Sequence, residues 1–463
     1  MCVSAKLLRS FTGIAKRHGV VWVFLSLFLI PTGDAVAQQR DAEEDAGDKM
    51  QSQQQETDGA IIQSTEGTLA DAVPTEAEQR ELGADEDPMA ASNAQRDVQR
   101  DVQREDEAEG EPERTTGFDF YGSVRIRYRD QGGNSGLQDG GSRMGVEADW
   151  QFEPGSFLIG RYEMGFNLLT GRVVEESRGN FRSSIFTRLF YVGLDAPNAN
   201  LIVGKNWSPY YKVSGITDRF QGAGGRAVGT YNALTDGGPT GTGRSDRAVQ
   251  GKLSLDFLPN KVFKPFDLNL QVQHGNSIPF GNGADYGTAV GLSAVMTTES
   301  NISVGLGYNH ASIDLKKDPS LRDIGLTGSA RAMVLGTRAF DEHWYAAFTV
   351  ARLNNHETTD EGIYFDGWGS EFFGKYRMTK YLWFVGGYNV LEPDSDQAQA
   401  GDFRVRYAML GLRHTIDTKD FRFMVFANVR LSDGRNAAGT HLSNVYTIGI
   451  RWDLSKRGWH MSQ

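Results

Sequence analysis

The feature that most constrains this chain is an alternation of apolar and polar residues with a period of two, repeated in many segments. In residues 118–130, FDFYGSVRIRYRD, aromatic and aliphatic residues fall on one face and polar residues, including three arginines, on the other. This is the period of a β-strand with one apolar and one polar side. Further clear segments, separated by Gly, Asn and Asp turns, are 142–152, 156–167, 380–390 and 444–454.

Residues 1–37 are predicted to be a secretory signal peptide. Four basic residues precede an apolar run at 20–30, and Ala35-Val36-Ala37 supplies small residues at the cleavage positions. The run is too short to span a bilayer comfortably. Cys2 is the only cysteine and lies ahead of the run, so the mature chain has none. Disulfides, cysteine chemistry and thiolate metal sites are therefore excluded.

Beyond this leader, the sequence contains no run of about 18 apolar residues that would mark a transmembrane helix. A membrane protein of this sequence must therefore be a β-barrel. The 55 glycines, 11% aromatic residues and only 39% hydrophobic residues fit a barrel whose strands are apolar at alternate positions. Composition alone would equally fit a large soluble β protein.

Residues 38–116 differ sharply from the rest of the chain. They hold 23 acidic and 7 basic residues and no Phe, Tyr or Trp. Such a segment cannot bury enough apolar surface to offset its ordering entropy, so we expect a disordered acidic arm. Its QRDVQRDVQRED repeat at 95–106 is interpreted as a solvated charged linker, with a short helix or a tether to a periplasmic or cell-wall partner as alternatives. From Gly117 onward the net charge is near +2, so the acidity belongs to the arm.

The length from 117 to 454 predicts the number of strands. A membrane strand with its share of turns and loops uses roughly 21 residues, which gives about sixteen strands, with fourteen or eighteen as alternatives. The closing segment 444–454 alternates with an aromatic-rich face and is followed by a short C-terminal extension, 455–463. The predicted fold class is all-β, an antiparallel up-and-down transmembrane barrel.

The energy of burying charge in lipid decides which face of each strand points inward. An arginine facing lipid at mid-membrane costs about 2 to 4 kcal/mol, so the polar faces should line the lumen. This parity places Arg125, Arg127 and Arg129 of the first segment inside. By the same parity the lumen side carries Arg143, Glu147, Asp149, Arg161 and Glu163.

Over essentially all of 117–454, the sequence resembles the trimeric general porins of Gram-negative outer membranes. The residues that carry the resemblance are FYGSVRIRYRD at the start, then 141–155, 187–196, 203–211 and 216–225, taken in their order and spacing. The resemblance implies a homotrimer in outer-membrane lipid and lipopolysaccharide, passing small hydrophilic solutes and ions by passive diffusion. It implies no cofactor, no metal, no catalysis and no nucleic-acid partner.

In that family the third extracellular loop folds into the barrel, and its acids face a ladder of arginines on the wall. The stretch from Trp207 to Gly243 matches this loop, and Asp218 falls where the family keeps a loop acid. A second loop acid aligns with Gly222 and is missing here. The other constriction residues that the resemblance implies are Arg143, Arg188 and Arg244 on the ladder, with Glu163 as a nearby acid and Asp246 as a further lumen residue. With three arginines against one loop acid, we predict weak anion preference or near neutrality.

The parity of Arg188 is a difficulty, because an inward Arg188 would also turn Phe190 and Val192 inward.

The sequence leaves three alternative functions open. An outer-membrane hydrolase is disfavoured because none of the six histidines of the predicted barrel sits in a nucleophile motif or at metal-ligand spacing. A substrate-specific channel for phosphate, sugars or dicarboxylates would use the same barrel. An envelope anchor would act through the acidic arm.

Overall fold

The structure is a computed structural model that describes residues 115–169, 175–177, 180–182, 185–221, 224–258, 262–418 and 421–460. The predicted signal peptide and the acidic arm up to residue 114 lie outside the described residues, as does Gly222. Within the described part of the chain, no helix is long and apolar enough to cross a membrane.

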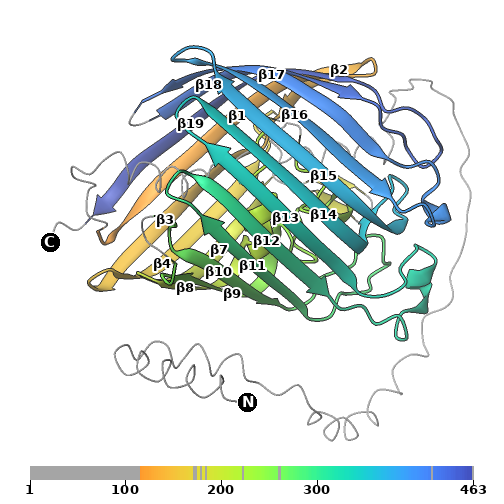
Figure 1. Cartoon of the computed structure of the whole chain (residues 1–463), viewed down its shortest axis with the longest axis horizontal. Coiled ribbons are helices and arrows are strands. Elements are labelled where there is room, and N and C mark those ends of the chain that lie inside the picture. The colour runs from red at the N-terminus through yellow and green to blue at the C-terminus, as the bar shows by residue number, and fades with distance from the viewer. Residues whose placement is uncertain are drawn as a thin grey trace, which may run out of the picture. The chain divides into compact units, whose positions relative to one another are not determined.

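All but two short strands of the described chain form one closed antiparallel barrel (Figure 1). The main sheet has 17 strands, and β1 pairs with β19, the last strand, which closes the circle. β2 and β3 pair with successive halves of β1 and are separated only by Gly140 and Gly141, so together they make one wall strand. The barrel therefore has sixteen wall strands, which confirms the predicted fold class and strand number.

The wall strands follow the chain in order, each pairing with the next. Their bounds are β1 (Gly117–Gln131), β2 (Asn134–Asp139), β3 (Ser142–Glu153), β4 (Ser156–Phe166), β7 (Ile185–Ala196), β8 (Ala199–Trp207), β9 (Arg244–Leu255), β10 (Phe266–Gln273), β11 (Ala289–Thr297), β12 (Ile302–Ala311), β13 (Ala330–Phe340), β14 (Trp344–Thr358), β15 (Tyr364–Arg377), β16 (Leu382–Pro393), β17 (Val405–Asp417), β18 (Phe421–Ser432) and β19 (Val445–His460).

Few elements lie outside the wall. β5 (Glu175–Ser177) and β6 (Asn180–Arg182) form a small hairpin between β4 and β7. The described helices are α5 (Pro209–Ser214) and three short 3₁₀ turns, η1 (Asn232–Leu234), η2 (Pro319–Arg322) and η3 (Ala398–Ala400).

The two ends of the barrel differ in the length of their connections. At one end, turns such as 154–155, 197–198 and 341–343 are short, whereas loops such as 208–243 and 312–329 at the other end are long. Outer-membrane barrels carry short turns on the periplasmic side and long loops outside. Residues 115 and 116 therefore lead into β1 at the periplasmic end, where Thr116 Oγ1 accepts a hydrogen bond of 2.9 Å from the Gln151 N–H.

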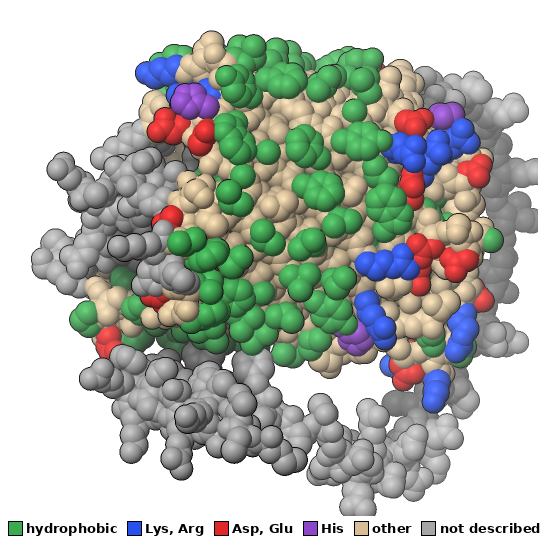
Figure 2. Space-filling view, in the orientation of Figure 1, with side chains coloured by type: hydrophobic (Ala, Val, Ile, Leu, Met, Phe, Trp, Pro, Cys, Tyr) green, Lys and Arg blue, Asp and Glu red, His purple; other side chains and the backbone are tan. Residues whose placement is uncertain are grey.

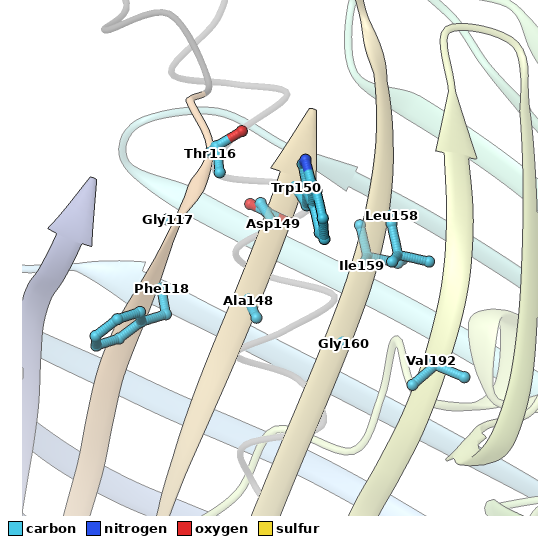
Figure 3. A pocket seen from close by; sticks show the side chains of 10 residues that line it. All are labelled: Thr116, Gly117, Phe118, Ala148, Asp149, Trp150, Leu158, Ile159, Gly160 and Val192. Atoms are coloured by element: carbon cyan, nitrogen blue, oxygen red, sulfur yellow. The ribbon is translucent and has the colours of Figure 1, made fainter. Parts of the chain in front are cut away.

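The outer wall carries an apolar belt (Figure 2). Phe120 on β1 and Ile448 on β19 are more than half exposed on this surface, as the alternation predicts. Arg125 and Arg127 of β1 are instead buried on the lumen side. A shallow apolar hollow lies on the outer wall across β1, β3, β4 and β7, and Trp150, Leu158 and Val192 are among its lining residues (Figure 3).

The last strand is longer than the alternation suggested. β19 runs to His460, six residues past Leu454, and Ser455 pairs with Tyr121 of β1. Most of the segment expected as an extension beyond the barrel, 455–463, is thus part of the closing strand pair. The backbone pairing with β19 continues there because β1 extends as far as Gly117, which pairs with His460.

Candidate functional site

The loop between β8 and β9, residues 208–243, folds into the lumen, and we call it the inner loop. Its helix α5 begins after Ser208, whose side chain accepts a hydrogen bond from the Tyr211 N–H, and Pro209 suits the first helical position. The helix packs against β11, β12 and β13. A methyl group at Gly336 of β13 would lie 2.9 Å from a Val213 side-chain carbon, so glycine there lets the helix approach the wall.

The far wall holds the inner loop through buried hydrogen bonds. Glu371 of β15 accepts from the Ala227 N–H and from the Thr217 hydroxyl, each at 2.7 Å. Tyr345 of β14 donates to the Ile216 carbonyl at 2.7 Å. Glu357 accepts from the Ala233 N–H at 3.0 Å. Because buried polar groups left unpaired are costly, these contacts keep the loop inside the barrel rather than above it.

Glu163 of β4 is the centre of a charged group on the lumen wall, which we call the Glu163 group. Its carboxylate accepts from Arg188 Nε at 2.8 Å and from the Tyr121 hydroxyl at 2.8 Å. Arg161 Nη2 lies 3.2 Å and Arg143 Nη1 3.9 Å from the same carboxylate. Three arginines from three wall strands therefore share one acid. The structure thus brings together Arg143, Arg188, Arg161 and Glu163, with Glu147 bound to Arg161 at 2.9 Å.

Arg188 faces inward because of a β-bulge. The pairing of β4 with β7 shifts register between Glu163 and Met164, which pair with Leu189 and Thr187, so Arg188 is the extra residue. A bulge breaks the strict alternation of faces. Arg188 and Leu189 are both buried, whereas Phe190 is 59% exposed on the outer wall. The apparent conflict in the parity of this strand is thus removed.

A second charged group lies where the inner loop joins β9. Arg244 Nε lies 3.4 Å from Asp236, and Lys205 Nζ lies 2.9 Å from Asp236 and 2.8 Å from Asp246. Burial raises the pKa of Asp236, but Arg244, Lys205 and the Gly238 N–H outweigh that effect, so its pKa lies below the usual value. Asp236 and Lys205 were not singled out in the sequence. The only signal for them in the sequence is a carboxylate inside the predicted loop and an amine just before it.

Known proteins match this chain in structure and not in sequence. No family model matches the sequence, and no curated protein matches it. Solved structures do match the barrel. OmpF of Salmonella typhi, solved in complex with daunomycin, superposes with a TM-score of 0.58 at 18% identity, covering 73% of this chain and 98% of that chain. The chain has the fold of an outer-membrane porin.

Two further structures match the porin barrel with TM-scores of 0.52. The anion-selective porin from Comamonas acidovorans is 14% identical and covers 73% of this chain and 100% of its own. The outer membrane channel DcaP of Acinetobacter baumannii is 12% identical, with 75% and 100% covered. At these identities the likeness concerns the fold. A closed barrel with an apolar belt satisfies all strand hydrogen bonds within lipid, and the porin barrel lies in the outer membrane.

Asp218 lies on the inner loop of this porin barrel and is buried. It accepts a hydrogen bond of 2.7 Å from the Tyr231 hydroxyl. Tyr231 packs in a cluster with Leu189, Trp207 and Tyr211, which puts the loop against the wall strand that carries Arg188. Gly225 has a positive φ of 68°, and a methyl group there would lie 2.6 Å from the Asp218 carboxylate, so glycine is needed at this close approach.

Arg125 belongs to a third network near the closing strand. Its Nε donates to the Ser123 hydroxyl at 2.9 Å, and Ser123 donates to Asp453 at 2.6 Å. Asp453 also accepts from Arg451 Nε at 2.8 Å. Arg127 is buried on the same face of β1. Within the described residues, no group of three or more His, Cys, Asp or Glu side chains is arranged to bind a metal ion.

Proposed function

We propose that this protein is a general diffusion porin, a water-filled channel through which small hydrophilic solutes and ions cross the outer membrane passively. The observation that carries the proposal is an inner loop with Asp218 and Asp236, held inside a closed barrel whose wall presents Arg143, Arg188 and Arg244. Fixed charges of opposite sign on the two sides of a narrow passage create a transverse field. Polar solutes that align with the field pass, and the balance of charge biases ion selectivity.

The proposed constriction consists of Arg143, Glu163, Arg188, Asp218 and Arg244, lined further along the lumen by Arg125, Arg127, Glu147, Arg161 and Asp246. Glu163, Asp236 and Asp246 offset much of the positive charge of the wall, since each lies within 4 Å of an arginine or lysine nitrogen. We therefore expect anion preference to be weak. The channel needs no catalytic residue and no cofactor.

The porin-like fold supports a homotrimer. The apolar hollow across β1, β3, β4 and β7 faces outward, where lipid or a second barrel would cover it. Residues 115 and 116, which follow the arm in the chain, lead into β1 at the periplasmic end, and this supports a periplasmic or cell-wall partner for the arm. Deleting 38–114 should leave conductance intact and abolish any such attachment. Loss of conductance on deletion would argue against a separate arm function.

Planar-bilayer recording of the purified mature protein in a KCl gradient tests the channel directly. We expect large steps closing in threes and a small reversal potential. Arg143→Ala should shift the reversal potential toward cation preference and Asp218→Ala toward anion preference. Arg352→Ala is the control, because Arg352 is exposed and pairs with Asp394 outside the proposed constriction. Absence of conductance, or shifts of the same sign in both variants, would contradict the proposal.

A further inference from the structure

A further group of cations lies in the lumen, where the inner loop meets β14, β15 and β17. Arg219 of the inner loop, Lys375 of β15 and Arg413 of β17 meet around two aromatic rings, and we call this arrangement the cationic–aromatic cluster. The Arg219 Cζ lies 4.1 Å and the Lys375 Nζ 6.0 Å from the centroid of the Tyr345 ring. Arg413 Nη2 donates to the Arg219 carbonyl at 2.5 Å, and its Cζ lies 5.7 Å from the Phe373 ring.

Register and small residues bring these groups together. Lys375 pairs directly with Tyr345 on β14 and with Val385 on β16, so these residues share one level of the wall. Glycine at position 387 makes room for the loop, because a methyl group there would lie 2.6 Å from the Phe220 ring. Lys375 is two residues from the end of β15, which puts the cluster toward the short-turn end of the barrel.

The cluster lacks an acid of its own. Among the described residues, no carboxylate forms an ion pair with Arg219, Lys375 or Arg413. Arg219 is 4% and Arg413 8% exposed, and Arg219 Nη2 and Arg413 Nε have no hydrogen-bond partner in the described structure. The two nearby arginines are matched, since Arg422 binds Asp417 and Arg451 binds Asp453, each at 2.8 Å. Like charges gathered without an acid repel one another, and cation–π contacts offset only part of that cost.

We propose that the cationic–aromatic cluster binds a small oxyanion, a carboxylate or a phosphate. Guanidinium groups present their N–H donors in a planar fork that matches both, and a charge-assisted hydrogen bond is about twice as strong as a neutral one. An anion here would accept hydrogen bonds from the N–H groups of Arg219 and Arg413 that have no partner in the described structure. The rings of Tyr345 and Phe373 restrict water around it.

The inference rests on the proposed channel function, because the ligand reaches the cluster through the lumen. Anions crossing the barrel would pause between the inner loop and the periplasmic opening. The site would thus favour entry of oxyanions over chloride without closing the pore to other solutes.

Single-channel recording with oxyanions added on the short-turn side tests the site. Inorganic phosphate, succinate and phthalate are titrated separately against the wild-type current in KCl. We expect at least one to reduce the current at millimolar concentration. Lys375→Gln and Arg413→Gln should each raise the half-blocking concentration about tenfold or more. Lys252→Gln, which removes a lumen cation already paired with Asp267 at 3.1 Å, should leave it unchanged.

Titration calorimetry of the detergent-solubilised full chain with the same three anions separates this site from the channel proposal. Binding that the two variants weaken supports the site even if no conductance is found, in which case only the channel proposal fails. Open channels with neither block nor binding would overturn the site alone, as would block that is equal in wild type and both variants. Phosphate acting alone assigns the site to inorganic phosphate, and preference for phthalate assigns it to aromatic carboxylates.

Discussion

The Glu163 group and the cationic–aromatic cluster both gather three cations inside one barrel, but they neutralise the charge differently. Arg143, Arg161 and Arg188 converge on the Glu163 carboxylate. Arg219, Lys375 and Arg413 instead lie against rings, with no acid among them. In the first group the protein itself supplies a counter-charge, so the group can maintain a permanent field. The second group gains a counter-charge only when an anion enters the lumen.

The two groups also differ in what assembles them. The Glu163 group comes from neighbouring wall strands, so closing the barrel suffices to form it. The cationic–aromatic cluster needs the inner loop, because Arg219 reaches the far wall only with the loop in place. Variants that act on one group and spare the other therefore test whether the difference is real.

The largest effect is expected from Glu163→Gln. Glu163→Gln removes the carboxylate that Arg143, Arg161 and Arg188 share. Breaking a buried ion pair costs about 3 to 5 kcal/mol. Guanidinium unfolding in lipid vesicles should show that loss. Glu147→Gln is the matched control, since Glu147 is 28% exposed and, within the part of the chain that the structure describes, forms an ion pair with Arg161 only. The loss of stability in this variant should stay below about 1 kcal/mol. Equal losses of unfolding free energy in both variants would show that Glu163 contributes no more to stability than Glu147 does.

Glu371→Ala should disrupt the cationic–aromatic cluster and leave the Glu163 group unchanged. Without this carboxylate the Ala227 N–H and the Thr217 hydroxyl lose their buried acceptor, at a cost of about 2 kcal/mol or more. The inner loop is then free to leave the wall and to carry Arg219 with it. Conductance should rise and oxyanion block should weaken, while the Glu163 group stays formed. Unchanged conductance would mean that other contacts suffice to hold the loop.

Asp236→Asn should show a pH-dependent effect of about 1 to 2 kcal/mol. The pKa of Asp236 is lower in the folded protein than in the unfolded chain, so its charged form stabilises the fold above the unfolded value. That contribution falls as the pH drops through the folded pKa. Wild type and variant should therefore differ at neutral pH and converge in strong acid. A difference that persists unchanged into strong acid would contradict this origin.

Lys375→Met is expected to have the smallest effect on stability. It removes a cation that has no acid partner among the described residues and keeps a side chain of similar length. The free energy of unfolding should change by less than about 1 kcal/mol, or should rise. A loss comparable to that of Glu163→Gln would show that Lys375 is paired within the protein, and the contrast between the two groups would disappear.

Much of the fold was predictable because alternation and lipid together leave few choices. Arg125 and Arg127 could not face hydrocarbon, so the face of β1 followed from the cost of burying charge. The strand number followed from length. The inward orientation of Arg188 could not be predicted in this way. It depends on a β-bulge in the pairing of β4 with β7, which breaks the alternation and has no signal in the sequence.

The candidate site was predictable only where it follows the wall strands. Glu163 and Arg143 could be identified from the alternation of their strands and from the family resemblance. Asp236 and Lys375 have neither, since one lies in a loop without periodicity and the other is one lysine among several. Their roles depend on contacts between segments more than thirty residues apart in the chain, such as Lys205 with Asp236.

By itself the sequence determined that a barrel with a charged interior is the transmembrane form open to the chain from Gly117, because a period of two and the absence of long apolar runs admit no other. Only the tertiary structure decided which charges meet. Pairing of β4 with β7, and of the inner loop with β14–β17, sets distances of a few ångströms between residues distant in sequence. Electrostatic energies depend steeply on such distances, so the Glu163 group has an acid at its centre and the cationic–aromatic cluster is left for a ligand.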